Sequence, residues 1–193
     1  MSLFSSVEMA PRDPILGLNE QFAADPSPHK VNLGVGVYFD ENGKLPLLTC
    51  VRSAEEHLMS KPSARGYLPI DGIAAYDAAV KALVFGAESS ALSDQRVATV
   101  QALGGTGGLK IGADFLKKIN PNAKVLISDP SWENHRALFS QAGFSVGTYA
   151  YYDAHQRGVN FQGMLDSLRQ AEAGTVVVLH ACCHNPTGYD ITP

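Results

Sequence analysis

The sequence predicts an α/β protein with a mostly parallel sheet and helices on both faces. From residue 97 onward, strand-like segments alternate with single helical segments, and a helical crossover of this kind joins parallel strands. The run Thr175–Leu179 is almost wholly apolar, which is typical of a strand buried on both faces. No internal repeat or low-complexity segment interrupts the alternation.

The N-terminal region predicts less regular structure. Residues 1–30 are rich in Pro and Asp, so we expect an extended arm around a short helix near Ile15–Phe22. Glycine-interrupted apolar residues over Val31–Phe39 predict a bent strand, and Glu41–Lys44 predicts a tight turn. An arm of this kind needs another surface to lie on.

Helical and strand patterns then follow in order. Apolar and small residues at helical spacing predict helices over Val51–Lys61 and Ile73–Phe85, with a loop over Arg65–Gly72 between them. Further strands are predicted at 97–102, 125–128, 144–151 and 175–182, and further helices at 107–119, 133–142 and 161–171. Thr192 and Pro193 are typical of a helix start, so we expect a truncated chain.

The composition is that of a globular protein, with 45% hydrophobic and 18% charged residues. The net charge of −4 is spread without acidic or basic blocks, which argues against nucleic acid and leaves small molecules as partners. No apolar run has the length of a membrane span, and no signal peptide is evident. Cys50, Cys182 and Cys183 form no disulfide framework, so we expect a cytoplasmic protein.

Three loops follow predicted strands, at the sheet edge where α/β proteins bind ligands. The first, Gly104–Gly108, opens a helix, so its amides and the Thr106 hydroxyl can hold a phosphate. It matches neither the dinucleotide fingerprint nor the nucleotide P-loop, because the glycine spacing and the position of Lys110 differ. A tight turn without a ligand is the alternative.

The second loop places Trp132, the single tryptophan, at this edge, where an indole can stack on a flat ring. Alternatively, Trp132 covers a helix end and His135 packs or caps. The third loop, His180–Gly188, carries so many polar groups after an apolar strand that they need partners. Adjacent cysteines rarely share a zinc site, and Cys182 is expected to be buried rather than nucleophilic.

The segment His184-Asn-Pro-Thr-Gly188 closely resembles the signature of class I aminotransferases, which are pyridoxal-phosphate (PLP) enzymes. Segments beginning at Val31, Tyr67, Gly104 and Pro130 resemble family segments in family order, so the resemblance covers essentially the whole chain. It implies an incomplete large domain of the PLP-dependent transferase fold type I over residues 46–193. Residues 1–45 would form the N-terminal arm and part of a small domain.

The resemblance also implies roles for individual residues. Gly105 and Thr106 would bind the cofactor phosphate, Trp132 would stack on the pyridine ring, and Asn185 would donate to its 3′ oxygen. These chemistries are reasonable, because amides at a helix start suit a dianion and an indole suits an aromatic ring. Tyr67 would reach the cofactor phosphate of the partner subunit in a homodimer.

Two further positions take roles from the resemblance. Gly36 would bring backbone close to the substrate, which Trp132 and Asn185 would also contact. His135 would support the acid that pairs with the pyridine nitrogen. The bonds Asp129–Pro130 and Asn185–Pro186 are the expected cis peptides.

The implied reaction is ping-pong transfer of an amino group from an amino acid to a 2-oxo acid such as 2-oxoglutarate, with PLP as the electron sink. The last lysine is Lys124, so the lysine that would hold the cofactor, and with it every catalytic residue, is expected beyond Pro193. By the same resemblance, Phe39 and Leu45 would lie near the substrate side chain, where aspartate-directed relatives often carry polar residues, and this favours an aromatic substrate over aspartate. A nucleotide-binding oxidoreductase and a non-catalytic truncated remnant stay open as alternatives.

Overall fold

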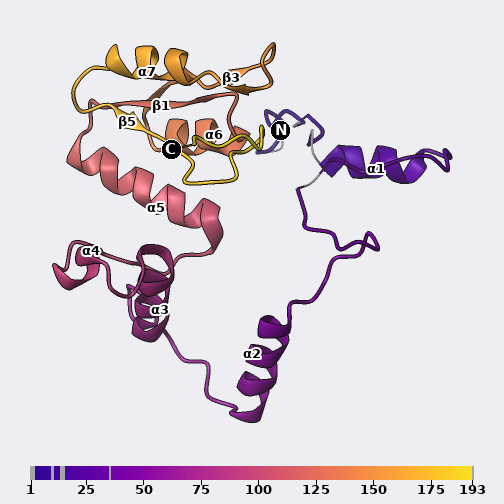
Figure 1. The fold of residues 1–193 in the computed structure, drawn as a ribbon, viewed down its shortest axis with the longest axis vertical. Helices are drawn as coiled ribbons and strands as arrows, with labels where there is room; N and C mark the ends of the chain where they lie inside the picture. The colour runs from indigo at the N-terminus through magenta and orange to yellow at the C-terminus, as the bar shows by residue number, and fades with distance from the viewer. Residues whose placement is uncertain (1–2, 10, 14–15, 35, 193) are drawn as a thin grey trace. The chain divides into compact units, whose positions relative to one another are not determined.

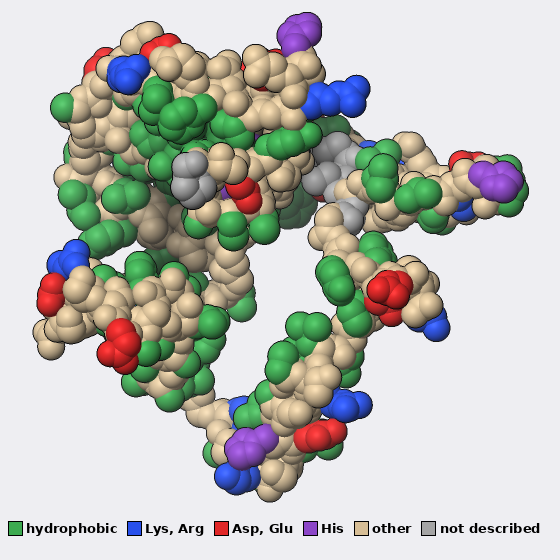
Figure 2. All heavy atoms as spheres, in the orientation of Figure 1, with side chains coloured by type: hydrophobic (Ala, Val, Ile, Leu, Met, Phe, Trp, Pro, Cys, Tyr) green, Lys and Arg blue, Asp and Glu red, His purple; other side chains and the backbone are tan. Residues whose placement is uncertain are grey.

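A computed structural model describes residues 3–9, 11–13, 16–34 and 36–192, and the chain divides into two compact units, Met1–Arg65 and Gly66–Pro193. The first unit contains helices α1 (Leu16–Ala24) and α2 (Thr49–Ser60), which confirms both predicted helices. Neither helix buries a residue. Figure 2 shows hydrophobic side chains lying at the surface of this unit. Leu58 and Met59 of α2, for example, are exposed.

The strand predicted over Val31–Phe39 is wrong for the described residues 31–34 and 36–39, which are irregular. An extended segment becomes a strand only when a neighbour pairs with its amides and carbonyls, and the described part of this unit provides none. The turn that follows is confirmed. Asp40 Oδ1 accepts hydrogen bonds from the amides of Asn42 (2.9 Å) and Lys44 (2.8 Å).

The second unit holds the sheet and the remaining helices (Figure 1). Its helices are α3 (Ala74–Phe85), α4 (Ser90–Ser93), α5 (Gly104–Ile119), α6 (Glu133–Gln141) and α7 (Phe161–Arg169). Its strands are β1 (Lys124–Asp129), β2 (Ser145–Ala150), β3 (Tyr152–Asp153), β4 (Gly158–Val159) and β5 (Val176–Val177). β3 and β4 form a short antiparallel hairpin that the sequence did not predict.

The three-stranded sheet has the order β2-β1-β5, and both strand pairs are parallel. Its register pairs Val125 with Val146 on one side and with Val176 on the other. The chain moves from β1 to β2 through α6 and returns past β1 to β5 through α7. Because parallel crossovers share one hand, this reversal puts the two helices on opposite faces of the sheet.

The core reflects this layering, because alternate residues of each strand face opposite sides. Val125 and Ile127 pack with α5 and α6 in one cluster, whereas Leu126 packs against Met164 of α7 in another. Figure 1 shows α7 on one side of the strands and α5 and α6 on the other. The predicted α/β class, with a parallel sheet and helices on both faces, is therefore confirmed.

Three predicted elements need correction. No strand forms at 97–102, where the Gln101 amide instead donates to the carbonyl of Asp71 (2.9 Å) in a loop. The strand predicted at 175–182 pairs only over Val176–Val177, and its last ladder bond runs from the Val178 amide to Leu126 O. α5 begins at Gly104, three residues before the predicted 107, so the glycine loop is the first turn of a helix.

The other predicted helices and strands of this unit lie within about two residues of their observed bounds, the usual variation at element ends. Among the helices that the structure describes, none is both long and apolar enough to cross a membrane.

Candidate functional site

The carboxyl edge of the sheet collects the loops that the sequence singled out. β1 ends at Asp129 and leads to Trp132, and the chain after β5 carries His180 and His184. α5 precedes β1 with only a short turn between them, so it runs antiparallel to β1 and starts over the same edge. The start of α6 lies beside the loop after β5, because the rings of His135 and His180 have centroids 5.2 Å apart.

Trp132 is half-buried at the position preceding α6, after a cis peptide bond between Asp129 and Pro130. Its ring meets that of His135 edge to face, with centroids 5.2 Å apart. His135 is buried, and its Nδ1 lies 2.9 Å from Ser131 Oγ. Burial lowers the pKa of His135, and the nearby His180 lowers it further. The imidazole is therefore neutral near pH 7 and supports the indole.

Three histidine rings lie in a row next to Trp132, in the order His135, His180 and His184. The ring centroids of His135 and His180 are 5.2 Å apart, and those of His180 and His184 are 4.4 Å apart. Burial lowers the pKa of His180 as well, although the nearby Asp190 opposes the shift. His180 Nδ1 is buried without a hydrogen-bond partner in the described part of the chain, so it can accept or donate one further bond.

The loop from Cys183 to Asp190 is closed by its own hydrogen bonds. The carboxylate of Asp190 accepts from the amides of His184 (2.8 Å) and Cys183 (2.7 Å), and these bonds hold its pKa below the ordinary value. The Gly188 amide donates to the carbonyl of His184 (2.7 Å). Asn185 lies inside this closed loop, is exposed, and precedes Pro186 through a cis peptide bond, as predicted.

Gly105 and Thr106 are exposed in the first turn of α5. No side chain caps this helix, and its first turn carries no acidic residue. The free amides of a helix start bind anions. At Gly104 and Gly105, an added Cβ would meet no atom within 4 Å, so an anion can approach this backbone.

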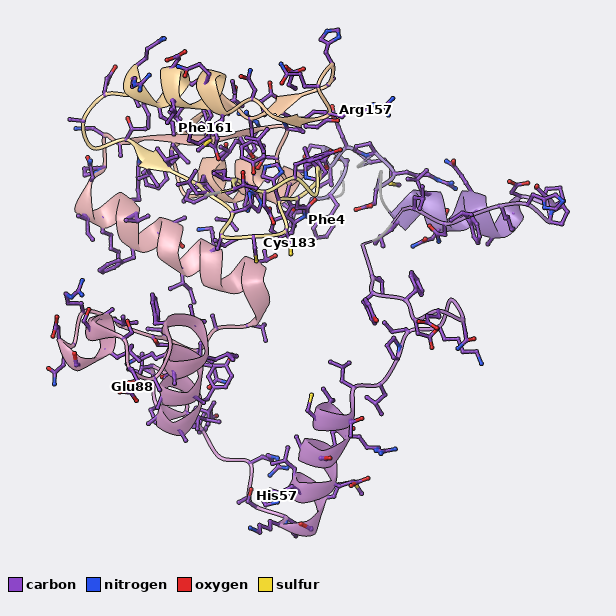
Figure 3. All side chains as sticks on the ribbon, in the orientation of Figure 1. Phe4, His57, Glu88, Arg157, Phe161 and Cys183 are labelled. Carbon is purple, nitrogen blue, oxygen red and sulfur yellow. The ribbon has the colours of Figure 1, made fainter. Side chains whose placement is uncertain are left out.

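Within the described residues of the second unit, no contact brings Tyr67 to this edge. Tyr67 is fully exposed in the loop before α3, and Gly36 is exposed in the first unit. Lys124 lies at the amino end of β1, opposite the site, and pairs with Glu172 at 2.7 Å. Cys182 is exposed, so the expectation that it is buried was wrong (Figure 3 labels its neighbour Cys183).

Sequence reasoning missed the part of Ser128 and Tyr151 in this site. Ser128 Oγ lies 2.8 Å from His184 Nε2, and the Tyr151 ring stacks on the His184 ring with centroids 3.9 Å apart. The only available signal was the polar run after the apolar strand, which required unidentified partners. Both ring nitrogens of His184 are occupied by hydroxyl groups, Nδ1 by Thr187 Oγ1 at 2.8 Å, and this argues against zinc.

The fold and site together define an α/β protein whose sheet edge carries a helix start without a capping side chain, an indole and a carboxamide. Residues 28–193 match the family described as aminotransferase class I and II. The chain belongs to this family.

Similar proteins agree with this assignment. An aspartate aminotransferase of Pseudomonas aeruginosa is 63% identical over 191 residues, which cover 99% of this chain and 48% of the relative. An aromatic-amino-acid aminotransferase of Escherichia coli is 49% identical, with 98% and 48% covered. The chain thus spans about half the length of the curated relatives it matches.

A solved structure is similar over the entire chain. The aromatic-amino-acid aminotransferase from Burkholderia pseudomallei, covalently bound to pyridoxal phosphate, is 67% identical and superimposes with a TM-score of 0.94. The match covers 100% of this chain and 48% of that protein.

Proposed function

We propose that the protein is a PLP-dependent aminotransferase that passes the amino group of an aromatic L-amino acid or L-aspartate to a 2-oxo acid such as 2-oxoglutarate. The observation that carries this proposal is the uncapped first turn of α5 at the same sheet edge as Trp132 and Asn185. Family membership and the similar aminotransferases support the same reaction class. When bound, PLP supplies an electron sink for the substrate's α-carbon.

The residues present fit PLP chemically. Its phosphate is a dianion, and the first turn of α5 offers free amides without a competing carboxylate. Gly105 and Thr106 would hold this phosphate, the first through its amide and the second also through its hydroxyl. A carboxylate in this turn would have repelled the dianion, so its absence from the first turn supports the assignment.

Trp132 and Asn185 would hold the ring. The indole would stack on the pyridine, and His135 would keep the indole in place through the edge-to-face contact at 5.2 Å. The Asn185 carboxamide would donate to the 3′ oxygen without protonating it. His135 would also face the acid that pairs with the pyridine nitrogen, and the orphaned His180 Nδ1 beside it can bond to an added polar group.

Other parts of the proposal concern the whole protein. Residues 1–45 would be an arm and part of a small domain, and residues 46–193 part of a PLP-binding large domain. Gly36 would contact the substrate, and Tyr67 would reach the cofactor phosphate of a partner subunit in a cytoplasmic homodimer. The exposure of Tyr67 supports a contact of this kind.

The test uses the natural full-length protein, purified and supplied with PLP. Aspartate, tyrosine and phenylalanine are each offered with 2-oxoglutarate, and the 2-oxo acid products are measured. Release of a stoichiometric 2-oxo acid from one amino acid alone is expected for a ping-pong reaction. A protein that binds NAD but not PLP would instead be the oxidoreductase alternative. Gel filtration should show a dimer, and a monomer would contradict the role of Tyr67.

A further inference from the structure

His184 is almost completely enclosed, with 2% of its surface exposed. Its Nε2 lies 2.8 Å from Ser128 Oγ, and its Nδ1 lies 2.8 Å from Thr187 Oγ1. Its ring stacks on Tyr151 with the two planes inclined by 15°. A histidine held on both nitrogens and on one ring face has a single available position.

The partners of His184 connect two different elements. Ser128 belongs to β1, four residues before Trp132, whereas Thr187 belongs to the loop that contains Asn185. The Gly188 amide also donates to the carbonyl of His184 (2.7 Å), which closes the backbone around Asn185 and Pro186. His184 therefore joins the strand that leads to Trp132 with the loop that carries Asn185.

We propose that His184 is a positioning residue that sets the spacing between Asn185 and Trp132, and so aims the Asn185 carboxamide at the ring on which Trp132 stacks. This inference rests on the proposed function, in which both side chains contact the same cofactor ring. The imidazole itself does not touch that ring. It acts through the backbone, because residue 184 is held at its side chain, its amide and its carbonyl.

The neutral imidazole suits this role, because one ring nitrogen accepts a hydrogen bond and the other donates one. A hydroxyl group can donate to the first nitrogen or accept from the second. A phenyl ring at position 184 keeps the stacking area but loses both bonds. The Ser128 and Thr187 hydroxyls would then lose a buried partner. The loop could shift relative to β1 even though the fold remained intact.

The experiment measures PLP bound to the natural full-length protein and to its His184→Phe, Asn185→Ala and doubly substituted variants. Two quantities are recorded: the dissociation constant for PLP and the pH at which the visible absorbance of the bound cofactor changes. The carboxamide stabilises the ionised 3′ oxygen, so Asn185→Ala should raise that pH. His184→Phe should raise it in the same direction, by about one pH unit, with about tenfold weaker binding.

The double variant decides whether His184 acts through Asn185. If it does, adding His184→Phe to Asn185→Ala changes the absorbance pH no further, whereas two independent effects would add. Additive shifts, or a His184→Phe protein with unchanged pH and affinity, would overturn the proposal. Should His184→Phe fail to fold, Ser128→Ala and its combination with Asn185→Ala give the same comparison, because they remove the link between His184 and β1.

Two substitutions at Thr187 provide the control. Thr187→Ser keeps the hydroxyl beside Nδ1 and should leave the absorbance pH unchanged, whereas Thr187→Val removes the hydroxyl at equal size and should raise it. Equal effects of these two variants would also overturn the proposal. If the unsubstituted protein binds no PLP, the proposed function itself has failed, and that result is visible before any variant is made.

Discussion

His184 and Ser128 form a buried contact of 2.8 Å between Nε2 and Oγ, although they lie 56 positions apart in the sequence. Ser128 is the fifth residue of β1, and His184 opens the Asn-Pro-Thr-Gly segment. The contact thus links the end of a central strand with the loop that best identifies the family. Protonation of the buried His184 should therefore affect the stability of the protein.

Stability should fall as the pH decreases from about 6.5 to about 4. Burial, then the His180 imidazole, lowers the pKa of His184 to about 4, whereas the unfolded side chain titrates near 6.5. The unfolded chain then binds the proton more tightly, so stability is complete above 6.5 and is lost toward 4. We expect a loss of about 2 kcal/mol, measured by urea unfolding across this range.

His184→Phe is the control for this pH dependence, because it removes the titrating group and should flatten the curve. The pKa values of His135 and His180 are lowered too, so part of the slope should remain. The stability that comes from the lowered pKa of Asp190 is lost only as the pH falls below the ordinary value of 3.8, which is outside this range. An unchanged slope in His184→Phe would contradict the assignment to His184.

Thr106→Val should weaken binding of PLP but not of pyridoxal, which lacks the phosphate. The substitution removes one hydroxyl from the first turn of α5 while keeping the size of the side chain. Loss of a hydrogen bond to a charged group is worth about 1.5–3 kcal/mol, so the dissociation constant should rise by tenfold or more. Equilibrium dialysis of both ligands measures this, and Thr106→Ser should retain the affinity of the natural protein. Equal losses of affinity for PLP and pyridoxal would show that Thr106 does not bind the phosphate.

Trp132→Ala should weaken PLP binding by about tenfold, and Trp132→Phe by less, because a phenyl ring keeps part of the stacking area. The half-buried indole contacts His135 but donates no hydrogen bond among the described residues, so truncation should leave the fold intact. Circular dichroism checks the fold, and cofactor titration measures affinity. Identical affinities for the Ala variant and the natural protein would rule out stacking.

Gly72→Ala should destabilise the protein by about 2 kcal/mol or more. Gly72 has a φ of 103°, and a Cβ there would lie 2.3 Å from Cβ of Gln101. Gln101 cannot retreat freely, because its Oε1 accepts from the Ile73 amide at 3.0 Å. Gly66→Ala is the matched control, because no atom lies within 4 Å of its added Cβ, and it should change stability by no more than about 0.5 kcal/mol. Thermal unfolding compares them, and equal midpoints would refute the clash.

Much of the second unit could be predicted from local pattern. The apolar run of β1 and the helical spacing of α6 and α7 carry their own signal, because a central strand is apolar on both faces and each of these helices on one. The glycine run at the start of α5 misled prediction, because glycine disfavours helix interiors by about 1 kcal/mol. The sixteen-residue helix nevertheless begins at Gly104 and includes the whole run to Gly108, and it packs on the sheet through Leu109 and Ala113.

Strand pairing could not be predicted in the same way. Val31–Phe39 and 97–102 have apolar residues suited to strands, but a strand forms only where a second segment receives its hydrogen bonds. Even the apolar run after Thr175 pairs with β1 over two residues only, Val176 and Val177. The chain then continues as the loop that carries His180 and His184.

The sequence by itself determined the fold class, the order of the loops at the sheet edge and the chemical groups they carry. Only the tertiary structure decided that His184 joins Ser128, Thr187 and Tyr151 and thereby connects the loops of Trp132 and Asn185. Local periodicity reports which face of an element is apolar. The partner of a buried polar group depends on which distant segment the fold places within hydrogen-bond distance of it.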